Sequence, residues 1–91
     1  MAHDTTEQIL HERGARYGQF AHHAAVTQAL KSMMQTHPNW SRLDADHKEA
    51  LEMIVHKIGR IVNGDPNYAD SWDDIAGYAV LVSNRIKGVL L

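Results

Sequence analysis

The sequence predicts an all-α fold: a compact bundle of three long helices plus a short N-terminal helix, in a single helical domain over residues 1–91, assembled as an oligomer. Apolar residues recur at the spacing of a helix face rather than alternating as they do in a strand. Only 6 Gly and 2 Pro are present, and five of these eight residues fall in three short breaks at residues 14–18, 36–41 and 63–67. A chain of 91 residues holds one domain, whose core alone gives marginal stability.

The first two helices are expected before Pro38. Residues Thr5-Thr6-Glu7-Gln8 form a capping-box pattern that opens a short helix ending near Arg13. We expect residues 14–18 to be irregular because two glycines bracket them. The second helix spans about residues 19–35, and Pro38 stops it. Its apolar stripe consists of Val26, Leu30 and Met33.

The third helix, over residues 44–63, is the clearest amphipathic segment, and Gly64 followed by Pro66 suits its end. At 100° per residue its apolar side chains form one continuous face of the kind that packs against other helices. The apolar face consists of Leu51, Ile54, Val55, Ile58, Ile61 and Val62, and the opposite face of Glu49, Glu52, His56, Arg60 and Asn63.

The fourth helix, over residues 71–90, has apolar residues on more than one side. Its main stripe consists of Ile75, Ala79, Val82, Ile86 and Leu90, but Val80 and Leu81 point elsewhere. In so short a chain the partner for these extra apolar residues is expected to be another subunit.

Carboxylates near the last two helices form the first candidate site. Glu49 and Glu52 lie three residues apart on one helix face, and Asp70 and Asp74 lie near the start of the next helix. Magnesium takes hard oxygen ligands and keeps waters for substrate phosphates, which such a set would suit. Helix capping and a solvated charged face explain the same residues without a metal.

Basic and aromatic residues form a second candidate site. Lys57 and Arg60 could supply positive charge to a phosphate. Arg16 and Tyr17, with Arg13 and Phe20 around two glycines, could present a guanidinium and a ring to a base or phosphate. In the alternative interpretation, Tyr17 and Phe20 plug the end of the helical core.

The chain has 7 histidines, but no two of them stand four residues apart and His-Glu-x-x-His is absent. Glu52 and His56 form one i,i+4 pair, for which a hydrogen bond or weak surface ion pair is the expected role. Zinc is therefore not expected.

Composition excludes several classes. The absence of Cys rules out disulfides and thiolate metal sites. The apolar runs are far below membrane-span length and the polar start is not a signal peptide, so we expect a cytoplasmic protein without a membrane partner. A formal net charge of −2 argues against nucleic acid as a partner.

Three blocks, at residues 12–20, 50–61 and 70–79, resemble a small all-helical family encoded mainly by phages and prophages and largely uncharacterised. The last two blocks are also distantly similar to the MazG-type all-α nucleoside triphosphate pyrophosphohydrolases. Those carry Glu-x-x-Glu on one helix and Glu-x-x-Asp on the next, which together hold magnesium. Glu49, Glu52 and Asp74 match this pattern, but Ser71 stands where the remaining Glu would fall, and Asp70 or Asp73 could replace it.

The resemblance implies a magnesium-dependent protein that binds a nucleotide, with hydrolysis left open. In the pyrophosphohydrolase mechanism it implies, Lys57, Arg60 or Arg16 would neutralise charge that develops on the phosphates. The alternative is a non-catalytic phage accessory protein that sequesters a nucleotide or inhibits a host protein. Either would work in the host cytoplasm as a homodimer or larger homo-oligomer.

Overall fold

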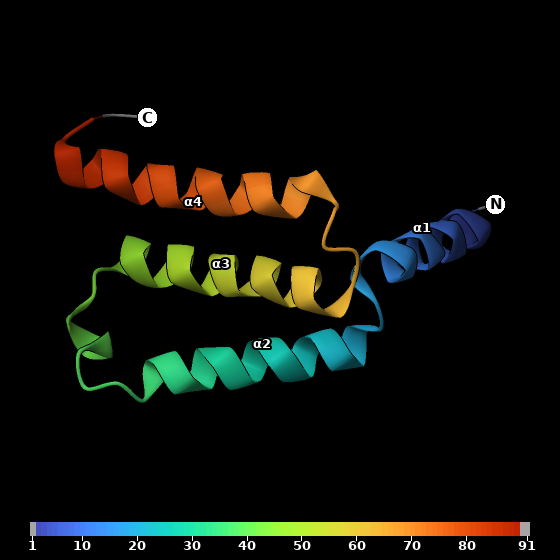
Figure 1. The fold of residues 1–91 in the computed structure, drawn as a ribbon, viewed down its shortest axis with the longest axis horizontal. Helices are drawn as coiled ribbons and strands as arrows, with labels where there is room; N and C mark the ends of the chain where they lie inside the picture. The colour runs from blue at the N-terminus through green and yellow to red at the C-terminus, as the bar shows by residue number, and fades with distance from the viewer. Residues whose placement is uncertain (1, 90–91) are drawn as a thin grey trace.

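The computed structural model describes residues 2–89 and contains four α-helices in that range, with no strand among the described residues (Figure 1). The all-α prediction is therefore confirmed. None of these helices is long and apolar enough to cross a membrane. The elements are α1 (Ala2–Tyr17), α2 (Phe20–Gln35), the 3-10 helix η1 (Trp40–Arg42), α3 (Ala45–Asn63) and α4 (Ala69–Lys87).

The first helix is longer than predicted. Helix α1 has 16 residues, as many as α2, so the bundle has four helices of similar length rather than three and a short one. The predicted capping residue Thr5 lies inside α1, and the helix continues through Gly14 to Tyr17. One glycine in a helix costs only about 1 kcal/mol, which its helix-favouring neighbours offset. The chain turns at Gly18, where φ is 76°.

Helices α2, α3 and α4 lie side by side as one layer with α3 in the middle, and α1 projects from the end of this layer (Figure 1). Side-chain contacts fix the register of α4 against α3. Lys57 pairs with Asp74 near the end of α3, and Asp46 pairs with Arg85 near its start, so the two helices are antiparallel. The predicted boundaries of α3 are confirmed within one residue, with Asp44 as the N-cap residue and Gly64 as the C-cap residue.

Asn63 joins α1, α2 and α3. Its side-chain amide donates to the carbonyl oxygen of Tyr17 at 2.7 Å and to that of Gln19 at 2.9 Å. A Cβ at Gly18 would collide with the Asn63 carbonyl, so the turn needs a glycine for space as well as for its positive φ. The end of α3 thereby holds the α1–α2 turn in place.

Few apolar side chains are buried. Among the described residues only Ala50 and Val55 are buried hydrophobic residues, whereas His23, Thr27, Lys57 and Ser71 are buried polar ones. The apolar face of α3 is partly exposed to solvent: Leu51 is 37% exposed and Val62 is 68% exposed. The reason is the layer arrangement: α2 and α4 flank α3 and leave this face uncovered.

We call this surface the open apolar face. On α3 it comprises Leu51, Ile54, Ile58 and Val62, which lie on one side at 100° per residue. Leu51 and Ile54 share a shallow, almost wholly apolar hollow of about 340 Å³ with Ala79 and Val82 of α4, so α4 extends the face. The opposite side of α3 carries Glu49, His56 and Arg60, and we call it the polar face.

Helix α2 extends the open apolar face on the other flank. Its buried His23 and Thr27 point at α3, and Phe20 lines a pocket with His56 and Arg60 on the polar face. Residues turned the other way from Phe20 therefore lie beside the open apolar face. They are Val26, Leu30 and Met33.

Candidate functional site

A pocket of about 440 Å³ lies where α1, α2 and α3 meet. We call it the α1–α2–α3 pocket. Its volume falls in the range of small-molecule sites, and its walls combine apolar and aromatic side chains with a few polar groups. The lining residues are Leu10, Arg13, Gly14, Tyr17, Gly18, Gln19, Phe20, His23, His56 and Arg60.

Two arginines and two tyrosines form a stack beside the pocket. The Arg60 guanidinium lies over the Tyr17 ring, 4.2 Å from its centre, and the Arg16 guanidinium lies 4.8 Å from the centre of Tyr68. The two tyrosine rings meet edge to face with centres 6.0 Å apart. Stacking fixes the plane of the Arg60 guanidinium but leaves its N–H groups available for hydrogen bonds.

A pair of histidines forms the floor of the pocket. Nε2 of His23 on α2 lies 3.4 Å from Nδ1 of His56 on α3, and the rings meet edge to face. His23 is 6% exposed and its Nδ1, beside Gly59, has no hydrogen-bond partner among the described residues. The pair is shared between two helices and depends on their close approach at Gly59.

Burial favours the neutral form of both histidines. Burial lowers the pKa of His56 to about 4, and the positive charge of Arg60 acts in the same direction. Burial also lowers the pKa of His23, by more than the adjacent Gly59 backbone raises it. The pocket therefore presents uncharged imidazoles, and its positive charge comes from the arginines.

Of the residues predicted to bind nucleotide or phosphate, only Tyr17 and Arg60 line the pocket. Arg16 is next to it but lies on Tyr68. Lys57 is in another place: its amine contacts the Asp74 carboxylate at 2.9 Å between α3 and α4, and its side chain is 11% exposed.

The predicted metal ligands do not form one group within the chain. The contact with Lys57 places Asp74 of α4 opposite Lys57 on α3. Lys57 is five residues from Glu52 and eight from Glu49, which correspond to about 7.5 and 12 Å along the helix at 1.5 Å per residue. Glu52 instead accepts a hydrogen bond from the Gln35 amide, and Asp70 lies a further turn away on α4. The four carboxylates thus do not fit one magnesium ion held by one chain, and magnesium binding stays a prediction.

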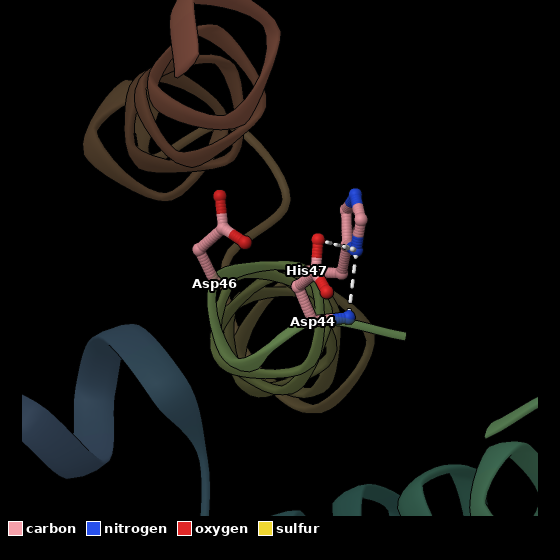
Figure 2. Close-up of side chains that lie close together, drawn as sticks. All are labelled: Asp44, Asp46 and His47. Carbon is pink, nitrogen blue, oxygen red and sulfur yellow. Dashed lines mark hydrogen bonds and ion pairs between the residues drawn. The ribbon is translucent and has the colours of Figure 1, made fainter. Parts of the chain in front are cut away.

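Among the side chains that the structure describes, those of residues 5–89, the group of three close enough to share a metal ion is Asp44, Asp46 and His47 at the start of α3 (Figure 2). Arg85 of α4 already occupies it. Its guanidinium donates two hydrogen bonds of 2.6 Å to Asp46, lies 3.2 Å from His47 Nε2, and is 3.4 Å from the Asp44 carboxylate.

The hydrogen bonds from Arg85 lower the pKa of the Asp46 carboxyl group, which a bound cation would also do. Nδ1 of His47 accepts from the Asp44 backbone amide and closes a capping box. Since every member has a partner, we interpret this group as an ion-pair clamp that joins α4 to α3.

Sequence reasoning missed the histidine pair and the role of Leu10 in the pocket. His23 and His56 are 33 residues apart, so no local sequence motif predicts their contact. The expected bond between Glu52 and His56 is replaced by the contacts of Glu52 with Gln35 and of His56 with His23. The one available signal was the position of His56 one turn before Arg60 on the same helix face.

These features define an all-helical protein with a ligand-sized pocket at a helix junction. The chain belongs to a family described as a domain of unknown function (DUF6378), whose model matches residues 2–86. This confirms membership in an uncharacterised family and leaves the MazG-like and phage resemblances as predictions. No curated protein and no solved structure matches the chain.

Proposed function

We propose that this protein binds a nucleotide in the α1–α2–α3 pocket. The observation that carries the proposal is the combination, in one pocket of about 440 Å³, of aromatic walls with the guanidinium groups of Arg13 and Arg60. A base needs a flat apolar surface, which the exposed Phe20 ring offers, and a phosphate needs N–H donors, which arginine supplies best. The neutral histidines add hydrogen-bonding atoms without adding charge.

Magnesium enters this proposal through Glu49 and Glu52. Both residues lie between the start of α3 and Arg60, on the polar side of the helix. At 1.5 Å per residue they are about 12 to 17 Å from Arg60 along the helix axis. A triphosphate that runs from Arg60 toward the start of α3 would bring its phosphates closer to these two carboxylates. Binding is therefore expected to be tighter for triphosphates with magnesium than without it, and hydrolysis is a separate question.

Isothermal titration calorimetry of the full chain with a panel of ribo- and deoxyribonucleoside triphosphates, with and without magnesium, tests the proposal. The informative variant is Arg13→Gln, because Arg13 lies exposed on α1 and its loss leaves the helix layer intact. Losing one charge-assisted hydrogen bond should raise Kd by about tenfold or more. Arg42→Gln removes the same charge from η1, outside the pocket, and should leave Kd within about twofold.

Absence of binding heat for every nucleotide would contradict the proposal, as would equal losses of affinity in Arg13→Gln and Arg42→Gln. An assay for released pyrophosphate then separates the two forms of the function. Release that disappears in Glu52→Gln supports a pyrophosphohydrolase. Tight binding without release supports a protein that sequesters the nucleotide.

A further inference from the structure

The molecule exposes more surface than a folded chain of its mass should. Its accessible surface is 6583 Å², whereas a monomeric protein of 10.2 kDa exposes about 5,300 Å². The radius of gyration, 15.6 Å, also exceeds the ~12 Å typical of a domain of this length. Helix α1, which projects from the layer, accounts for part of this excess of about 1,300 Å², and the ~800 Å² that each partner contributes to a standard interface fits within it.

Several of the exposed side chains are large and apolar. Ile86, one turn beyond Val82 on α4, is 62% exposed, Val62 on α3 is 68% exposed, and Met33 on α2 is 74% exposed. These three residues come from three adjacent helices and lie on the open apolar face. Large apolar side chains exposed on the same side of three neighbouring helices are more typical of an interface than of scattered surface residues.

We propose that a second copy of this chain packs on the open apolar face, so that two three-helix layers enclose one shared hydrophobic core. If each copy covers ~800 Å² of the other, the interface totals ~1,600 Å², which is the standard size for a stable complex. A two-fold axis through the face lets the same patch serve both copies. The low net charge of −2 opposes such association only weakly.

The α1–α2–α3 pocket is left free by this arrangement. It opens beside His56 and Arg60 on the polar face, on the opposite side of α3 from Leu51 and Ile58. The dimer proposal therefore does not depend on the proposed nucleotide function, and either can fail without the other.

Sedimentation velocity of the full chain between about 1 and 100 µM tests the inference. We expect a species of twice the 10.2 kDa chain mass. Val62→Glu and Ile86→Glu place a charge on the open apolar face at positions already well exposed in the single chain, so they should weaken dimerisation at least about tenfold. The matched control is Leu81→Glu, which is 53% exposed and lines a groove with Glu49 and Tyr78 away from that face; it should stay dimeric.

Thermal unfolding at several protein concentrations gives a readout that needs no variant. The Tm of a dimer rises with concentration, and it should do so here even if Val62→Glu proves too unstable to study. A wild-type monomer at 100 µM with a constant Tm would overturn the proposal, including when another protein binds that monomer. A dimer that survives both face substitutions but not Leu81→Glu would overturn the choice of face.

Discussion

Helices α2 and α3 approach each other closely at Gly59, and the substitution Gly59→Ala measures how tightly they pack there. A Cβ at this position would collide with Cγ2 of Thr27 and lie 3.0 Å from Cε1 and Nδ1 of His23. Thr27 is 4% exposed and its hydroxyl donates to the Ala24 carbonyl oxygen at 3.2 Å, so rotating the side chain away would disturb this hydrogen bond in a closely packed site. Alanine should gain about 1 kcal/mol of helix propensity but lose about 1–3 kcal/mol through overpacking. We expect a net destabilisation of up to about 2 kcal/mol.

Gly77→Ala is the matched control, because Gly77 also lies inside a helix but a methyl group there would have nothing within 4 Å. It should stabilise the protein by about 0.5–1 kcal/mol. Urea unfolding at fixed protein concentration measures the stability of both variants. In thermal unfolding, their Tm values should differ by roughly 4–8 °C for each kcal/mol of difference in stability. Thr27→Ser removes the colliding methyl group and should recover part of the loss in the Gly59→Ala background. If Gly59→Ala were as stable as Gly77→Ala, the described α2–α3 packing would be wrong.

Two further predictions concern titratable groups. Because burial lowers the pKa of His56 to about 4 and also lowers that of His23, the unfolded chain takes up protons at these residues at a higher pH than the folded chain does. Stability should therefore fall as pH drops from about 6.5 toward 4, by about 1–2 kcal/mol after allowance for the partial exposure of His56, and an NMR titration in which the His56 ring protonates near pH 6.5 would contradict this. Asp74→Asn removes the partner of the Lys57 amine, whose side chain is 11% exposed, and should destabilise the protein by about 1–3 kcal/mol in urea unfolding. Asp73→Asn, on the exposed neighbour, should change stability by less than about 0.5 kcal/mol, and equal effects of the two substitutions would argue against the ion pair.

The sequence predicted the helices better than their arrangement. The α3 boundaries followed from Asp44, Gly64 and a long amphipathic pattern, because capping and periodicity are local properties. The extent of α1 did not, because Gly14 signals a break although its helix penalty is small enough for the helix to continue. Periodicity placed Leu51 and Val62 on one apolar stripe, but it carries no information on whether a neighbouring element covers that stripe. In the single chain both residues are exposed.

The candidate site was predictable only in part. The chemistry of Tyr17 and Arg60 suggests a binding role, and the structure brings both to one pocket. The chemistry of Lys57 suggests the same role, yet Lys57 is three residues before Arg60, so its side chain points about 60° away around α3 and contacts Asp74 instead. The contact between His23 and His56 depends on the register of α2 on α3, a tertiary property that spacing along the chain does not encode.

The middle position of α3 makes it the element through which the two outer helices are connected (Figure 1). Helix α2 or α4 can separate from α3 while the other one stays packed against it, whereas separation of α3 disrupts the packing of all three helices. Amide protons should consequently exchange with deuterium in a graded order, with those of α1 fastest, those of α2 and α4 intermediate, and those of α3 slowest and closest to the rate set by global unfolding.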